Sequence, residues 1–279
     1  MALNTNVLVR NNVQIKGNVA ADRTLVFAHG FGTDQSAWSG VWPAFADTHR
    51  IVLFDYVGAN ETTVAQFKPE RYKTLYAFAD DLLDILEALN LTQVDLIGHS
   101  VGGTTGMLAA IQEPERFSRL VLMGSSPRYL NDEGYTGGFT EQDLNALFAQ
   151  MKGNYYGWVS GFAPFIARNP DNPHVADQFA QTLAAMRPDV GLSIARTIFE
   201  SDYRAVLANV PHPVLVIQPE HDSAVPKPVG EYFAQRLPNA QLIVLPTEGH
   251  LPHLSHPELV VNAIRPFLQH VPVDGLEPV

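Results

Sequence analysis

Short apolar runs alternate along the chain with longer segments whose apolar residues recur every three or four positions. The first pattern is typical of buried strands and the second of amphipathic helices. Strands are expected within residues 24–30, 50–58, 94–100, 119–126, 212–222 and 242–250, each ending shortly before the polar or glycine residues that close the segment, and the clearest helices at 75–90, 102–117 and 257–271. Strands that alternate with helices predict an α/β fold, with a mostly parallel central sheet flanked by helices.

Two segments depart from this alternation. Residues 7–18 predict an opening hairpin with its turn at Asn11 and Asn12. Residues 128–204 contain no convincing strand. They instead predict four aromatic-rich helices, at 141–151, 155–167, 174–186 and 190–201.

A helical insertion between two sheet strands most simply forms a lid over the end of the sheet. We therefore expect the chain to be organised in three parts. Residues 1–127 and 205–270 would form the core, residues 128–204 a four-helix lid, and residues 271–279 a flexible tail.

Composition restricts the function classes. The chain has 279 residues, of which 46% are hydrophobic and 17% charged, so it can bury a sizeable core. A net charge of -11 argues against nucleic acid or an anionic membrane as partner. The lack of cysteine excludes disulfides, thiol nucleophiles and thiolate metal ligands. Because no segment resembles a signal peptide or a membrane span, we expect a cytoplasmic protein.

A single serine lies between glycines directly after an expected strand. Residues 98–102 read Gly-His-Ser-Val-Gly, and a helix is expected to follow. In a strand–turn–helix setting this pattern predicts a nucleophile elbow. The turn is so tight that side chains at Gly98 and Gly102 would clash with neighbouring backbone, and the serine is held in a strained conformation. Ser100 is therefore the candidate nucleophile.

A nucleophilic serine requires a base, and the base requires an acid that orients it. After such an elbow the expected chain order is serine, then aspartate or glutamate, then histidine. Asp222 follows one expected strand and His250 follows the next. Asp222 could also be a turn residue beside Ser223 and Pro226, but its position between Ser100 and His250 favours the catalytic role.

The oxyanion that forms during acyl transfer needs hydrogen-bond donors. Residues 29–32, His-Gly-Phe-Gly, follow an early strand. We expect the amide of Phe31 to donate together with the amide of Val101. His29 is expected to support this loop through hydrogen bonds and to take no part in the chemistry.

Three histidines near the end of the chain could suggest a metal site, because His250, His253 and His256 are spaced by three. Pro252 and Pro257 interrupt any regular helix that would align them, and no acidic or thiolate ligand lies nearby. We therefore expect no metal and no cofactor, with one of these histidines catalytic and the others structural.

Several longer segments resemble one branch of the α/β-hydrolase superfamily, which includes the bacterial stress-response hydrolase RsbQ and the plant strigolactone and karrikin receptors. The most discriminating are GFGTDQSAW (30–38), SPRYLND (126–132) and EGHLPHLS (248–255). The resemblance covers residues 7–268. It implies an α/β-hydrolase fold, a V-shaped four-helix lid, a triad of Ser100, Asp222 and His250, and a deep pocket for a small hydrophobic molecule.

The resemblance also implies, by position, which side chains line the pocket. These are Phe31, Val101, Tyr129, Trp158, Phe162, Ile194, Phe199 and Ser223. The aromatic residues of 128–204 could in part simply pack the helices together, yet a helical lid needs an inner surface, and one so aromatic would line an apolar pocket.

Three functions are compatible with these features. The favoured one is a serine hydrolase that cleaves a small hydrophobic ester or butenolide-like lactone through an acyl-enzyme. The second is a receptor or regulator of the strigolactone, karrikin or RsbQ type, with slow hydrolysis, whose output is a contact between the lid and a regulatory protein. The third is related chemistry such as carbon–carbon bond hydrolysis or perhydrolysis. Haloalkane dehalogenation is disfavoured because it would require aspartate in place of Ser100.

Overall fold

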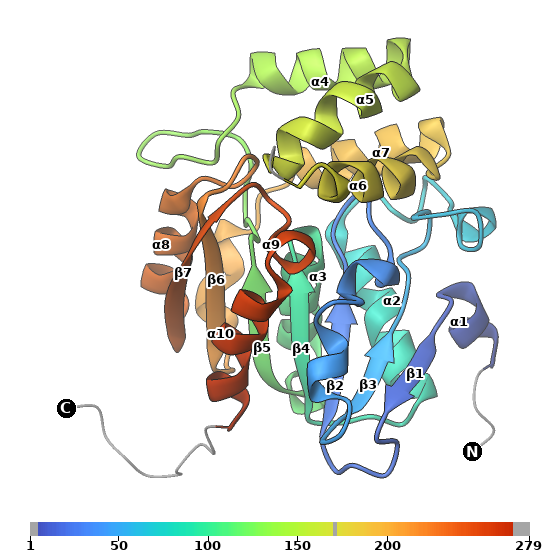
Figure 1. Cartoon of the computed structure of the whole chain (residues 1–279), viewed down its shortest axis with the longest axis vertical. Coiled ribbons are helices and arrows are strands. Elements are labelled where there is room, and N and C mark those ends of the chain that lie inside the picture. Colours follow the sequence, from blue (N-terminus) through green and yellow to red (C-terminus); the bar gives the residue numbers. More distant parts are fainter. Residues whose placement is uncertain (1–4, 170–171, 270–279) are drawn as a thin grey trace.

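A computed structural model describes residues 5–169 and 172–269 of the chain. In these ranges a seven-stranded sheet is flanked by helices, and four further helices cover one end of it (Figure 1). The strand order is β1–β3–β2–β4–β5–β6–β7, and every neighbouring pair is parallel except β1 with β3. The predicted mostly parallel sheet with flanking helices is confirmed.

The strands are β1 (Gln14–Gly17), β2 (Thr24–Ala28), β3 (Arg50–Leu53), β4 (Val94–His99), β5 (Phe117–Met123), β6 (Val214–His221) and β7 (Ala240–Glu248). Outside the insertion, the α-helices are α1 (Thr5–Arg10), α2 (Leu75–Ala88), α3 (Val101–Gln112), α8 (Lys227–Arg236), α9 (Pro252–Ser255) and α10 (Pro257–Gln269). Short 3-10 helices lie at Gln35–Trp38, Trp42–Phe45, Val64–Gln66, Pro114–Arg116 and Arg204–Asn209.

The sheet has a separate apolar core on each face, because successive side chains of a strand point to opposite sides. Val26 and Leu96 belong to the core shared with α2, α3 and α8. Phe27 and Ile97, each one residue further on, belong to the core shared with α10 and Trp38. Burial on both faces explains why the central strands appear in the sequence as continuous apolar runs.

The N-terminal segment differs from the predicted hairpin. Thr5–Arg10 form helix α1, and only β1 after it is a strand. Val7 is buried in the core beside α2, and the guanidinium of Arg10 lies 3.1 Å from Asp81 and 3.0 Å from Asp84 on α2. These contacts with a distant helix favour the helical conformation, so the hairpin prediction is wrong.

The insertion consists of the four predicted helices. They are α4 (Glu141–Gly153), α5 (Tyr155–Ala167), α6 (His174–Ala184) and α7 (Pro188–Phe199), between β5 and β6 in the chain. They stack above the end of the sheet at which the parallel strands terminate (Figure 1). The division into a core and a lid with the predicted boundaries stays a prediction, and the expected tail lies outside the described residues.

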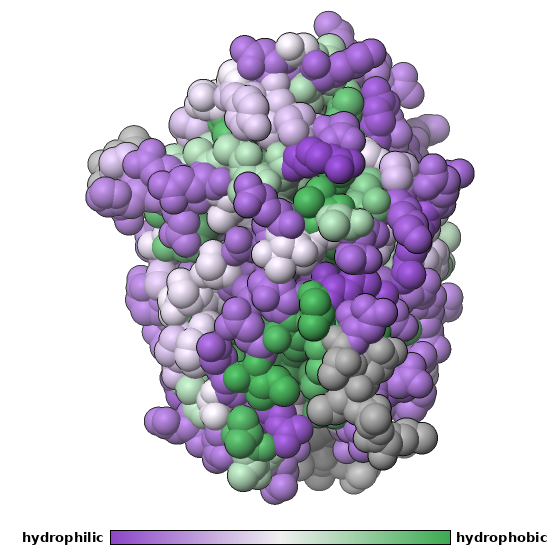
Figure 2. Space-filling view, turned by 90° about the vertical axis from the view of Figure 1, so that its right-hand side faces the viewer, coloured by the Kyte–Doolittle hydropathy of each residue, from purple (hydrophilic) through white to green (hydrophobic). Residues whose placement is uncertain are grey.

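The edge strand β1 lies on a face with exposed apolar side chains. Apolar residues gather on the lower part of this face (Figure 2). The large apolar residues exposed in and around α1 and β1 are Val9, Ile15 and Val19.

In the described part of the chain, no helix has the length and apolar character needed to cross a membrane.

One buried carboxylate joins three loops near the end of the sheet that the insertion covers. Asp55 follows β3 and is 1% exposed. Its Oδ1 accepts the backbone amide of Gln35 at 2.9 Å, and its Oδ2 accepts the side-chain amides of Asn12 at 2.7 Å and Asn60 at 2.9 Å. Asp55 therefore fixes the loop after β2 relative to the loop after β3.

Replacing Asp55 by alanine should destabilise the fold strongly, because three donors lose their acceptor. We expect Asp55→Ala to lower the free energy of unfolding by about 3 kcal/mol in urea titrations. Asp47→Ala, at an exposed carboxylate, is the control and should change it by less than about 0.5 kcal/mol. Equal stabilities of the two variants would contradict this role for Asp55.

Candidate active site

The turn between β4 and α3 holds Ser100 in a rarely populated backbone conformation. Its φ is 54° and its ψ is -126°, values that a residue with a side chain adopts only when its surroundings impose them. The Ser100 amide donates to the carbonyl of Met123 on β5 at 2.8 Å, which fixes the turn to the neighbouring strand. Backbone strain of this kind is typical of functional sites.

The glycines of the turn are required by close backbone contacts. A Cβ placed on Gly98 would lie 2.4 Å from the Cα of Gly103, in α3. A Cβ on Gly102 would lie 2.4 Å from the carbonyl oxygens of Ala28 and His29, at the end of β2. The predicted steric reason for both glycines is confirmed.

Enlarging Gly102 should therefore disrupt the site. Gly102→Ala is expected to lower the free energy of unfolding by about 2 kcal/mol, because its Cβ would overlap rigid backbone. Gly161→Ala on α5 is the matched control: nothing lies within 4 Å of its added Cβ, and alanine should stabilise that helix by up to about 1 kcal/mol. Chemical denaturation of both variants tests the contrast, and a neutral Gly102→Ala would contradict it.

Three side chains from three different strand ends meet beside this turn. His250 Nε2 lies 3.0 Å from Ser100 Oγ, and His250 Nδ1 lies 2.9 Å from each carboxylate oxygen of Asp222. An ionised carboxylate only accepts hydrogen bonds, so Nδ1 carries the proton and Nε2 is free to accept one from the serine. This arrangement can activate a hydroxyl as a nucleophile.

The acid and the base are both held by backbone hydrogen bonds. The Asp222 carboxylate is fully buried, and its Oδ1 also accepts the amides of Ala224 at 2.8 Å and Val225 at 2.9 Å. The His250 amide donates to the carbonyl of Ile166, at the C-terminal end of α5, at 2.8 Å. The loop that carries the histidine is thus attached directly to the insertion.

The loop after β2 lies against the serine. A Cβ on Gly30 would be 3.2 Å from Ser100 Cβ. His29 supports this loop as predicted: its Nδ1 donates to the Gly30 carbonyl at 2.8 Å, and its Nε2 accepts the Tyr56 amide at 3.0 Å. Burial lowers the pKa of His29, which keeps its imidazole neutral.

Two backbone amides beside Ser100 have the character expected of oxyanion donors. Among the described residues, neither the amide of Phe31 nor that of Val101 donates to a protein acceptor. Val101 is also the first residue of α3, where the helix dipole favours negative charge. The assignment of the oxyanion hole to these two amides stays a prediction.

The space in front of Ser100, which we term the serine chamber, is mostly apolar. Its lining residues come from the core and from the insertion: Phe31, Ser100, Tyr129, Phe139, Phe162, Ile166, Phe179, Ile198, Phe199, Ala224, His250 and Leu251. Tyr129 places its hydroxyl 3.4 Å from Ser100 Oγ. Burial raises the pKa of the Tyr129 phenol, so it remains a neutral hydrogen-bonding group.

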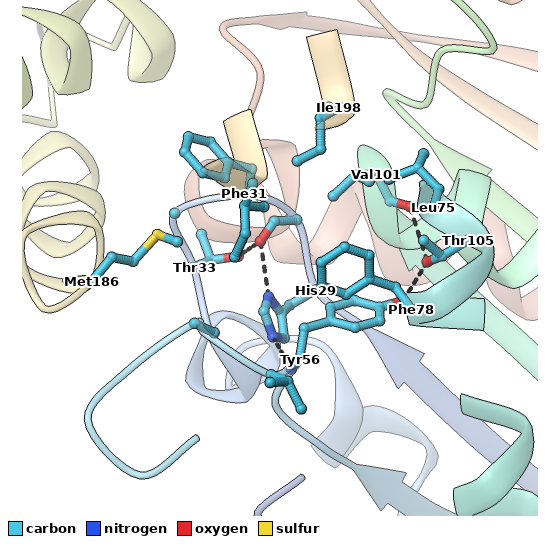
Figure 3. A pocket seen from close by; sticks show the side chains of 15 residues that line it. His29, Phe31, Thr33, Tyr56, Leu75, Phe78, Val101, Thr105, Met186 and Ile198 are labelled. Atoms are coloured by element: carbon cyan, nitrogen blue, oxygen red, sulfur yellow. Dashed lines mark hydrogen bonds between the residues drawn. The ribbon is translucent and has the colours of Figure 1, made fainter. Parts of the chain in front are cut away.

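A second apolar space, the rear chamber, adjoins the first. Phe31 and Ile198 line both chambers, and Ile198 of α7 lies on the opposite side of the rear chamber from Tyr56 and Phe78 (Figure 3). The Tyr56 and Thr105 hydroxyls there are hydrogen-bonded to each other. These two hydroxyls therefore have hydrogen-bond partners within the protein, and the surface that this chamber presents to a bound molecule is mostly apolar.

The structure divides the predicted pocket residues into three groups. Phe31, Tyr129, Phe162 and Phe199 line the serine chamber, Val101 and Ile194 line only the rear chamber, and Trp158 and Ser223 line neither.

Trp158 is buried behind the chamber wall. Its ring stacks on Phe162 with the ring centroids 4.6 Å apart. Ile198 was missed by sequence reasoning, although it follows Ile194 by four residues and so lies on the same face of α7. That spacing is the signal that could have found it.

Two other histidines near His250, His99 and His253, are buried, whereas His256 is half-buried. His253 is 1% exposed, and in the described part of the chain neither of its ring nitrogens has a hydrogen-bond partner. Burial lowers the pKa of His253 to about 3, and it also lowers that of His99. Within residues 5–169 and 172–269, no group of three or more histidine, aspartate or glutamate side chains is arranged to hold a metal ion.

The low pKa of His253 should appear as pH-dependent stability. Between about pH 3 and 6.5 the unfolded chain binds a proton at His253 that the folded chain does not, so stability falls as the pH falls. We expect His253→Phe to reduce this slope by about 1.4 kcal/mol per pH unit near pH 5. Urea titrations of both proteins from pH 7 to pH 5 measure it; parallel curves would contradict the prediction.

Comparison of the chain with known proteins identifies its family. Residues 23–257 match the model of the alpha/beta hydrolase fold. The chain belongs to the α/β-hydrolase family. This α/β hydrolase is 44% identical over 264 residues to Strigolactone esterase RMS3 of Pisum sativum, covering 94% of this chain and 98% of that protein.

Two further similarities agree with this assignment. The hydrolase is 42% identical to Karrikin insensitive 2 receptor CA of Petunia hybrida, over 93% of this chain and 96% of the receptor. A solved structure of a hydrolase from Oleispira antarctica superimposes with a TM-score of 0.92 and 32% identity, over 96% of this chain and 97% of that one. The predicted resemblance to strigolactone and karrikin proteins is confirmed.

Proposed function

We propose that this α/β hydrolase cleaves small, uncharged, hydrophobic esters or lactones through an acyl-enzyme formed on Ser100. The observation that carries the proposal is the hydrogen-bonded series Ser100–His250–Asp222 at the wall of an apolar chamber. Names of relatives support the substrate class, since one is a strigolactone esterase.

In the first half of the reaction, Ser100 Oγ attacks the substrate carbonyl carbon while its proton passes to His250 Nε2. The carbonyl oxygen becomes an oxyanion, which the amides of Phe31 and Val101 stabilise. Asp222 stabilises the imidazolium that His250 becomes. The imidazolium then protonates the leaving alkoxide, which departs and leaves an ester between Ser100 and the acyl group.

In the second half, His250 takes a proton from water, and the resulting hydroxide attacks the acyl carbon. Collapse of the second oxyanion releases the acid and returns the proton to Ser100. For a lactone, the alcohol and the acid are two ends of one product. The apolar walls contributed by Phe162 and Phe199 exclude bulk water and favour substrates without charge.

A second candidate is a receptor that hydrolyses its ligand slowly and signals by binding a regulatory protein through α4–α7. The similarity to a karrikin receptor over nearly the whole length of both chains favours this candidate. Both candidates use the same three side chains, so the number of turnovers distinguishes them.

Ser100→Ala should abolish hydrolysis, because it removes the nucleophile. We expect turnover of a p-nitrophenyl ester to fall by about a thousandfold or more. Ser118→Ala, which removes an exposed hydroxyl bonded to the carbonyl of Gln93, is the control and should keep full activity. Retained turnover in Ser100→Ala would refute the mechanism.

Intact mass spectrometry separates the hydrolase from the receptor. The protein is incubated with the same ester and, in a second experiment, with a synthetic strigolactone analogue. Many turnovers with a transient adduct support the hydrolase. A persistent adduct after one turnover of the analogue, with slow ester cleavage, supports the receptor.

A further inference from the structure

His99 contacts both the loop of the proposed base and the loop of a candidate oxyanion donor, although its side chain has no role in the reaction scheme above. It is the last residue of β4, directly before Ser100, and is 1% exposed. Its Nε2 lies 2.8 Å from the main-chain carbonyl oxygen of His250. Because a carbonyl oxygen only accepts, Nε2 carries the proton and donates it. One hydrogen bond thus joins the strand of the nucleophile to the loop of the base.

The opposite edge of the His99 ring faces the loop of the oxyanion donors. A Cβ on Gly30 would lie 2.6 Å from His99 Nδ1, so the backbone of this loop packs directly on the ring. Among the described residues, Nδ1 has no hydrogen-bond partner. The orientation of the ring is therefore determined by its donor on one side and by close packing on the other.

Further rings behind His99 prevent it from moving away. Its ring centroid is 4.8 Å from that of His250 and 4.3 Å from that of His253, and His253 in turn lies 4.8 Å from Trp38. Trp38 is fully buried. Burial also lowers the pKa of His99, so the ring stays neutral and keeps a single N–H donor.

We propose that His99 is a positioning residue, whose hydrogen bond to the His250 carbonyl holds the base where it can accept the proton of Ser100. The side chain of His250 is oriented by Asp222, but its main chain also needs a fixed position, because small displacements of a proton acceptor are costly. This inference rests on the proposed function.

The test removes the donor and keeps the ring. His99→Phe should lower kcat for a p-nitrophenyl ester about tenfold or more and leave KM within about twofold, because only the alignment of the base changes. His99→Gln, whose amide extends to the region of Nε2, should recover part of this loss. His99→Asn, whose amide is one carbon shorter, should not.

His212 provides a matched control. It is also a buried histidine whose Nε2 donates to a main-chain carbonyl, that of Pro114, at 2.9 Å, and its Nδ1 likewise has no partner among the described residues. It precedes β6, at the end of the sheet opposite Ser100. His212→Phe should lose a similar amount of stability in urea titrations while kcat stays unchanged.

The outcomes are distinct. Equal kcat values for His99→Phe and His212→Phe would overturn the positioning role. A variant His99→Phe that raises KM and leaves kcat unchanged would overturn it too. If His99→Phe does not fold, the comparison of His99→Gln with His99→Asn decides, and equal kcat values would overturn the proposal. Full turnover by Ser100→Ala would instead refute the proposed function, whatever the His99 variants do.

Discussion

Three backbone segments pack against one another around Ser100 with no room for side chains between them. The end of β2, the end of β4 and the first turn of α3 approach so closely that a methyl group at Gly98 or Gly102 would overlap backbone atoms. This contact forces the unusual conformation of Ser100 and places the loop after β2 beside it. The positions of the nucleophile and of the two candidate oxyanion donors are therefore fixed by the same backbone contact.

Burial and hydrogen bonding together decide which histidine can act as a base. Four of them, His29, His99, His250 and His253, lie near the turn, and in the described residues His250 alone is hydrogen-bonded to a carboxylate. An imidazolium at any of the other three positions would be buried without such a partner, which is energetically costly. All four side chains have the same intrinsic basicity, so it is its surroundings that make His250 the candidate base.

Local sequence patterns predict most elements well. They also indicate Ser100, Asp222 and His250, which the structure brings within hydrogen-bond distance, because each stands at a strand end that the apolar runs reveal. Directions of side chains on the insertion were harder to predict. Trp158 and Phe162 lie four residues apart on α5, yet Phe162 reaches the serine chamber and Trp158 stacks behind it, a difference set by contacts between helices. Helix α1 was missed for a similar reason, since Arg10 and Val7 depend on partners in and beside α2.

The hydrogen bond between the His250 amide and the Ile166 carbonyl links the covering helices to the base. Phe162, one turn earlier on α5, lines the space that a substrate must enter. A displacement of this end of α5 would break the bond and release the main chain of His250. The covering helices and the loop of the proposed base are therefore mechanically coupled, because the position of α5 sets the main-chain position of His250.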